Sequence, residues 1–266
     1  MNINRGKLYA FLNLFGFLGM VVVNALATTL PINNKSTGAL SDQYPNLFVP
    51  AGLTFSIWGV IYLLLAMFVV YSLITTFRNT QEKVFVEKIG IFFLISCLVN
   101  IGWIFAWHYE LVALSLLLML ILLASLLTIY LRFNIGKSST TRTERYAIHL
   151  PFSIYLGWIT IATIANATAL LVDIGWNAIG LSEQFWAIAV IAVGIGIALA
   201  VLFRRNDIFF GLVVDWALLG ILLKRLADNT IPDQGVVVVT IVGLALISAA
   251  IALQIFRGRV YQQATS

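Results

Sequence analysis

The stretch from Ala147 to Asn166, AIHLPFSIYLGWITIATIAN, decides how this chain is interpreted. A helix advances about 100° per residue, so one face of this stretch would carry Pro151, Tyr155, Trp158, Ala162 and Asn166. The opposite face consists of Ile, Leu and Ala. Pro151 removes a backbone donor early in the helix, which predicts a bend near Ala147. In hydrocarbon, an amide and two polar-tipped rings need partners or a ligand, so we expect other helices to enclose a space on this face.

The composition identifies the class of protein. Hydrophobic residues make up 61% of the 266 residues and charged residues 10%, with a mean hydropathy of +0.99. Because a soluble domain is about a quarter charged, this chain is expected to be an all-α integral membrane protein in contact with the lipid bilayer. Its long apolar runs lack the alternation of a β-barrel. The single cysteine, Cys97, excludes an intrachain disulfide.

Eight apolar segments are long enough to cross a bilayer. They lie at about 8–29, 51–77, 89–109, 111–131, 147–174, 184–203, 208–226 and 235–256. The sequence therefore predicts eight transmembrane helices joined by short polar connections.

The basic residues indicate the orientation. Of the 16 Lys and Arg residues, three lie in one set of alternate connections, namely Lys35, Lys224 and Arg225. The other set holds the remaining thirteen: Arg5, Lys7, Arg78, Lys83, Lys88, Arg132, Lys137, Arg142, Arg145, Arg204, Arg205, Arg257 and Arg259. The positive-inside rule then places both termini in the cytoplasm of a multi-pass protein of the plasma membrane. This rule also accounts for the isoelectric point of about 9.4 without a nucleic-acid partner.

The first segment has a second interpretation. Met1–Lys7, an apolar run and Ala25-Leu26-Ala27 together look like a secretory signal peptide. The run is long for one, and it contains Asn13 and Asn24, which share a helix face with Phe17 and Met20. We expect a retained helix; cleavage after residue 27 would leave seven spans and an outer N-terminus.

The long outer connection Pro31–Val49 is either a lid or a mobile connector.

The aromatic residues of three segments form stripes that are either ligand-lining or plain bundle packing. Trp58 and Tyr62 are one turn apart, and Asn100, Trp103 and Trp107 share a face. Trp107, together with Tyr109, Trp176 and Trp186, also suits an interfacial aromatic belt.

These motifs resemble the tryptophan-rich sensory protein and translocator protein (TspO/MBR) family. They are Pro50 with Trp58 and Tyr62, Asn100 with Trp103, and Pro151 on the fifth segment, and the resemblance covers about residues 8–174. It implies a five-helix bundle around a pocket for a tetrapyrrole-, sterol- or isoprenoid-like amphipathic ligand, with no agreed enzymatic reaction. The pocket residues carried over are Trp58, Tyr62, Asn100, Trp103, Tyr155, Trp158 and Asn166.

The chain departs from the family pattern at several positions. Phe55 replaces a second proline before Trp58, Tyr155 stands where a tryptophan is expected, and Asn166 comes about one turn late. We therefore expect this chain to share the helix bundle of the family more closely than its type of ligand. We expect a TspO-like bundle at 1–175 and a three-helix extension at 176–266.

The extension contains Asp215, an acidic residue near the middle of the seventh segment. A carboxylate in hydrocarbon costs several kcal/mol unless paired, hydrated or protonated. Asp215 is therefore either a structural group bonded to a neighbouring helix or a coupling site for protons or ions.

The function classes that remain are metal binding, catalysis, small-molecule binding and transport. His108 and His149 lie on opposite sides of the membrane and cannot share a metal. No enzyme signature is present, so we expect no catalytic residues and no required cofactor beyond a porphyrin-like ligand that the resemblance allows. The preferred function is binding of an amphipathic small molecule, as a sensor, receptor or carrier, with a homodimer left open. The alternative is a small secondary transporter that uses Asp215.

Overall fold

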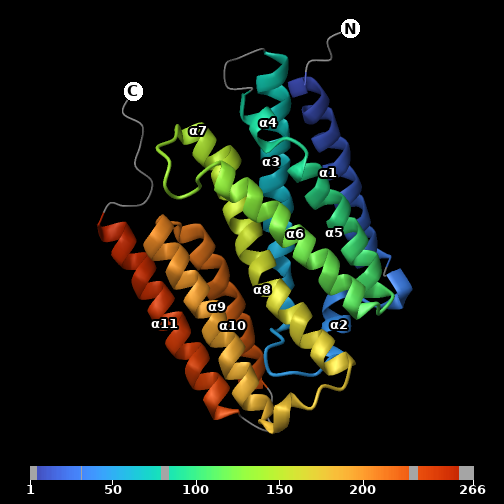
Figure 1. The fold of residues 1–266 in the computed structure, drawn as a ribbon, viewed down its shortest axis with the longest axis vertical. Coiled ribbons are helices and arrows are strands. Elements are labelled where there is room, and N and C mark those ends of the chain that lie inside the picture. Colours follow the sequence, from blue (N-terminus) through green and yellow to red (C-terminus); the bar gives the residue numbers. More distant parts are fainter. Residues whose placement is uncertain (1–4, 31, 79–83, 228–232, 258–266) are drawn as a thin grey trace.

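The computed structural model describes residues 5–30, 32–78, 84–227 and 233–257. Among the predicted features, Met1, Pro31, Lys83 and Arg259 lie outside the described residues. Each of the eight apolar segments contains a long helix, so these helix positions are confirmed (Figure 1). The helices are α1 (Arg5–Thr29), α3 (Ile57–Phe77), α5 (Phe92–His108), α6 (Val112–Arg132), α8 (Leu150–Asp173), α9 (Glu183–Arg205), α10 (Ile208–Ala227) and α11 (Gln234–Phe256).

Shorter elements connect these helices. The connection between α1 and α3 contains the 3-10 turn η1 (Ile32–Asn34), the helix α2 (Thr37–Asp42) and the 3-10 turn η2 (Gly52–Ser56). The helix α4 (Val84–Ile89) precedes α5, and η5 (Ala178–Gly180) joins α8 to α9. The helix α7 (Arg142–Glu144) and the π-helical turn η4 (Arg145–His149) lead into α8.

Within the described residues, six helical segments are long and apolar enough to cross a membrane. They are α1, η2 with α3, α6, α7 through α8, α9 and α11. Helix α5 has 17 residues, and α10 carries Asp215, Lys224 and Arg225. The protein is therefore a multi-pass helical membrane protein, while the count of eight crossings stays a prediction.

The helices run up and down the long axis of the molecule (Figure 1). The start of α1 and the end of α11 lie at the same end, as an even number of crossings requires. Helices α1, α3, α5, α6 and α8 pack on one another, and α9, α10 and α11 pack beside them, with α10 against α8. The predicted boundary at residue 175 falls between α8 and α9, and the division into two domains remains a prediction.

The irregular turn before α8 follows from Pro151. Proline lacks the N–H group that would bond to the carbonyl of Ala147. The chain forms the π-helical turn η4 at residues 145–149, and Pro151 then lies in the first turn of α8. A π-helical irregularity thus lies where the sequence predicts a bend, and the bend itself stays a prediction. The predicted inward face of α8 is confirmed, since Pro151, Tyr155, Trp158 and Asn166 are buried.

Candidate ligand-binding site

Trp58 of α3 is the centre of a cluster of aromatic rings. Its ring stacks on Tyr62 with centroids 5.5 Å apart, and it meets Tyr155 edge-on at 6.0 Å. Its centroid is 6.3 Å from that of Trp103 on α5 and 6.2 Å from that of Trp158 on α8. Edge-to-face and offset geometries of this kind stabilise aromatic pairs by about 0.5–1.5 kcal/mol each. Rings from three helices thus meet inside the bundle.

A ladder of polar groups lies behind these rings. The Nδ2 atom of Asn24 on α1 donates to Oδ1 of Asn100 at 2.8 Å, and Nδ2 of Asn100 donates to the Tyr155 hydroxyl at 3.3 Å. Asn24 also donates to the Met20 carbonyl at 2.9 Å. All four residues are buried, and bonding between helices satisfies amides that hydrocarbon would leave unpaired. The ladder ties α1, α5 and α8 together.

A second polar link fixes the orientation of Trp103. Its Nε1 donates to Oδ1 of Asn166 at 3.0 Å, and Nδ2 of Asn166 donates to Oγ of Ser115 on α6 at 2.9 Å. Asn166 therefore accepts a hydrogen bond from α5 and donates one to α6. The sequence analysis selected Asn166 and Trp103 but not Ser115, because serine within a membrane helix usually bonds only to its own backbone.

The clustered rings border a small cavity. Of the seven predicted pocket residues, Trp58, Trp103, Trp158 and Asn166 line it. Tyr62, Asn100 and Tyr155 lie one layer behind, in contact with Trp58 or with each other. Phe48, Pro50 and Phe55 close the outer side, and Ala217 and Ile221 of α10 add a wall from the extension. The free volume is about 50 Å³, room for a few water molecules.

Two buried donors in this region have no hydrogen-bond partner among the described residues. They are Nε1 of Trp158, which lines the cavity, and the hydroxyl of Tyr62 behind it. An unsatisfied buried donor costs about 1–3 kcal/mol. The Trp158 indole is therefore the group best placed to meet an acceptor on a ligand.

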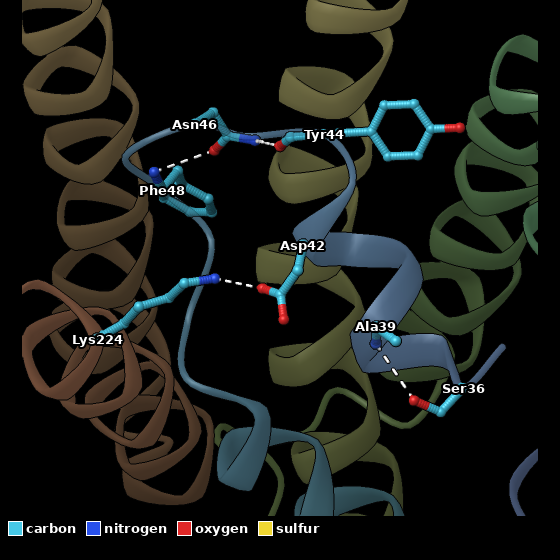
Figure 2. A network of polar contacts seen from close by, with 7 residues as sticks. All are labelled: Ser36, Ala39, Asp42, Tyr44, Asn46, Phe48 and Lys224. Carbon is cyan, nitrogen blue, oxygen red and sulfur yellow. Dashed lines mark hydrogen bonds and ion pairs between the residues drawn. The ribbon is translucent and has the colours of Figure 1, made fainter. Parts of the chain in front are cut away.

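Residues of the connection between α1 and α3 form one wall of this cavity, and Figure 2 shows polar contacts that hold this connection. Thr37 and Ser41 of α2, together with Phe48 and Pro50, belong to the cavity lining. Oγ of Ser36 accepts from the backbone N–H of Ala39 and caps α2. Asn46 accepts from the N–H of Phe48 at 3.0 Å and donates to the carbonyl of Tyr44 at 2.8 Å, which fixes the turn that carries Phe48.

Helix α10 holds this connection from one side. Asp42 forms an ion pair with Lys224 (Figure 2). The N–H of Ala51 donates to the carbonyl of Gly220 at 2.9 Å. Nε1 of Trp216 donates to the carbonyl of Thr54 at 2.9 Å. A Cβ atom on Gly220 would lie 1.9 Å from Oγ1 of Thr54, so only glycine allows this close approach. Residues 32–56, which include α2, thus contact α10 of the extension, and we refer to this segment as the lid.

Helix α5 holds the lid from the other side. The Trp107 ring lies 5.6 Å from that of Tyr44, and its Nε1 donates to the carbonyl of Thr37 at 3.3 Å. Asn33 donates to the carbonyl of His108, and Lys35 pairs with Glu110. Burial raises the pKa of the Tyr44 hydroxyl, and the carboxylates of Glu110 and Asp173 raise it further. Trp107 was predicted either on the inward stripe with Trp103 or in an interfacial belt; it is buried and lines the cavity under the lid, which favours the inward stripe.

Asp215 lies apart from the aromatic cavity and is not among its lining residues. Oγ of Ser248 on α11 donates to its Oδ2 at 2.8 Å, and its Oδ1 has no partner among the described residues. The carboxyl group is thus bonded to a neighbouring helix, as the structural interpretation expects. In the part of the chain that the structure describes, no group of His, Cys, Asp and Glu side chains is suited to a metal ion.

A buried carboxylate that the sequence analysis missed is Asp207, in the connection between α9 and α10. It accepts from Oγ of Ser153 on α8 at 2.6 Å and from the hydroxyl of Tyr130 on α6 at 2.8 Å. The N–H groups of Phe209 and Phe210 also donate to it, so it caps α10. Burial raises the pKa of Asp207, and these donors oppose that rise. The signal that could have found it is an Asp directly before an apolar helix, a common N-cap.

Comparison with curated proteins gave no match, and comparison with solved structures gave none either. A family model described as TSPO-like protein matches residues 10–253. The match extends beyond the 8–174 of the predicted resemblance and includes α9, α10 and most of α11. The multi-pass helical architecture and a match over most of the sequence lead to one conclusion, that this chain belongs to the TSPO-like protein family.

Proposed function

We propose that the protein is a membrane receptor or carrier that binds one amphipathic small molecule among α3, α5, α8 and α10, beneath the lid. The observation that carries the proposal is the buried indole Nε1 of Trp158, which lines the aromatic cavity and has no partner among the described residues. Ligand sites of this type combine apolar walls with a few placed polar groups. The tetrapyrrole-, sterol- and isoprenoid-like classes all fit this description.

The walls indicate how such a ligand would be held. The rings of Trp58, Trp103 and Trp158 offer stacking surfaces, and Asn166 offers an amide already oriented by Trp103 and Ser115. Stacking and apolar burial would supply most of the affinity. The Trp158 donor and the Asn166 amide would fix the orientation of the ligand.

Binding requires the rings and the lid to move apart. The cavity has about 50 Å³ of free volume, whereas pockets for drug-sized ligands hold roughly 300–1,000 Å³. Because Phe48 and Pro50 of the lid form part of the lining, displacement of the lid would enlarge the cavity directly. We propose that this event occurs on the outer side of the plasma membrane, with both termini in the cytoplasm, and that the protein catalyses no reaction.

Mass spectrometry of the molecules that copurify in mild detergent tests this function. The wild-type protein is compared with a variant carrying Trp158→Ala and Asn166→Ala, and with the control Tyr109→Ala, an exposed residue outside the lining of this cavity and of the larger cavity beside α8 and α9. The double variant should lose a small molecule that both other preparations retain. The same set of molecules in all three preparations would refute the proposed site.

A further inference from the structure

We propose that a second cavity, at the outer ends of α8 and α9, binds a single-chain amphipath with a positively charged head group. Its walls are lid residues 45–48, the last turns of α8, the connection to α9 and the first turns of α9. The free volume is about 390 Å³, several times that of the aromatic cavity. This lies within the range of small-molecule sites, roughly 300–1,000 Å³, without any movement of the chain.

Two indole rings form the part of this cavity suited to a head group. The rings of Trp176 and Trp186 meet edge to face with centroids 4.9 Å apart, and both line the cavity. Nε1 of Trp186 donates to the carbonyl of Ala178 at 2.9 Å, so this indole is held in place and its N–H is already used. What the ring offers a ligand is its π face, which attracts an organic cation. Indoles also concentrate at the level of lipid head groups.

The charge at the rim favours the same ligand. Glu183 is the one charged residue of the lining, and it is exposed. As the first residue of α9 it lies at the positive end of a helix dipole, which is equivalent to about half an elementary charge. The full negative charge of the carboxylate outweighs that half charge. A cationic head is therefore attracted to this rim, and an anionic head is repelled.

The three basic residues predicted on the same side, Lys35, Lys224 and Arg225, form no ion pair with Glu183 within the part of the chain described. Lys35 is paired with Glu110, and Lys224 is paired with Asp42. Glu183 has no ion pair among the described residues. Its carboxylate thus remains available to a positively charged ligand at the membrane surface.

The remaining walls suit an alkyl chain. Leu47, Leu171, Val172 and Val190 are apolar, and the small side chain of Ala187 leaves space between them. Phe48 is the residue that lines both cavities and separates this one from the aromatic cavity. The second site is therefore distinct from the proposed ligand site, and its existence does not depend on that proposal.

Photolabelling of the full chain in zwitterionic lipid nanodiscs tests the second site. The probe is dodecylamine with a diazirine on its alkyl chain, and the charge-reversed control is the matching dodecanoate. Labelled peptides are identified by mass spectrometry with and without excess unlabelled dodecylamine. We expect competable labelling of peptides from 45–48 and 168–190 by the amine. A charge-assisted contact of roughly 1 kcal/mol predicts about fivefold less labelling by the carboxylate.

Matched variants show whether Glu183 provides the attraction. Glu183→Gln keeps the size of the side chain and should lower amine labelling about fivefold. The control Asp173→Asn removes another exposed carboxylate from the same end of the molecule, outside the lining, and should change labelling less than about twofold. Because Glu183 is exposed, its replacement should leave elution on size exclusion unchanged.

Two results would overturn the second site. One is equal labelling of these peptides by the amine and the carboxylate, and the other is amine labelling that Glu183→Gln leaves intact. The variant Trp158→Ala with Asn166→Ala separates this proposal from the proposed function, because these residues do not line the second cavity. Labelling that persists in this variant supports the second site even if no molecule copurifies with the wild type. Labelling that disappears in it would refute a separate site.

Discussion

Trp158 differs from Trp103 and Trp107, two other indoles of the aromatic cavity, in its hydrogen bonding. Nε1 of Trp103 bonds to Asn166 and Nε1 of Trp107 bonds to Thr37, whereas Nε1 of Trp158 has no partner among the described residues. Trp158→Phe should therefore remove a hydrogen bond to the ligand without breaking a hydrogen bond within the protein. We expect about fivefold weaker binding of the copurified molecule, the effect of losing a hydrogen bond of about 1 kcal/mol.

Titration of the purified variant with the copurified molecule measures this change. Trp176→Phe is the control, because Trp176 lies in the second cavity and not in the aromatic one. Unchanged affinity in Trp158→Phe would show that this N–H does not bind the ligand.

The polar ladder predicts an order of stabilities. Asn100→Ala leaves the Asn24 amide and the Tyr155 hydroxyl without their shared partner, so it should destabilise the protein by about 1–3 kcal/mol. Tyr155→Phe removes only the end of the ladder, a bond of 3.3 Å, and should cost less, about 1 kcal/mol or below. Thermal unfolding in detergent measures both. The reverse order would mean that the Asn24–Asn100 bond does not stabilise the bundle.

Residue patterns predicted which side chains point inward, but not what covers them. Burial of Asn13, Phe17, Met20 and Asn24 on one face of α1 agrees with the periodicity. For Trp107 the sequence left two interpretations open, an inward stripe and an interfacial belt, because its position in the segment gives depth alone. Its burial depends on the lid, whose docking involves residues about 70 positions away, such as Thr37.

Helices were easier to predict than their connections. Apolar length alone located the eight long helices, since each must satisfy its own backbone in hydrocarbon. The lid was ambiguous because its position depends on contacts with α5 and α10, distant in the sequence. These include the Asp42–Lys224 pair and the close approach of Thr54 to Gly220. Asp207 was missed for a similar reason, since two of its partners lie on α6 and α8.

The lid should open more readily when one of its two ion pairs, Asp42–Lys224, is removed. Lys224→Gln deletes the contact to Asp42, and exposed ion pairs contribute about 0–1 kcal/mol. Hydrogen exchange of the α2 amides should therefore rise by up to about fivefold, while exchange in α6 should not change. A variant with the two charges swapped, Asp42→Lys with Lys224→Asp, should restore the wild-type rate of hydrogen exchange in α2. If hydrogen exchange in this variant is as fast as in Lys224→Gln, the ion pair does not hold the lid.

At the scale of the whole molecule, replacement of Asp215 distinguishes a binding protein from a proton-coupled transporter. Asp215 lies outside the aromatic cavity and bonds to Ser248 across the α10–α11 contact. Asp215→Asn should therefore leave binding of the copurified molecule within about twofold of wild type. If the protein instead transports this molecule by proton coupling, the same change should abolish pH-dependent flux in liposomes while binding persists. Binding and flux are measured on the same preparation. Loss of binding in Asp215→Asn would contradict the placement of Asp215 outside the site.

The topology of the whole chain can be tested by cysteine accessibility. The positive-inside distribution predicts that Lys137 faces the cytoplasm and that Asn177, on the opposite side of the bilayer, faces outward. Both positions are exposed, and the native Cys97 is buried. In a Cys97→Ser background, a membrane-impermeant maleimide added to intact cells should label Asn177→Cys and not Lys137→Cys. Lysis should make Lys137→Cys reactive, which shows that the site was shielded by the membrane and not by the fold. Because one crossing, through α8, separates the two positions, the opposite labelling would invert the orientation of every helix and place the lid and both cavities on the cytoplasmic side.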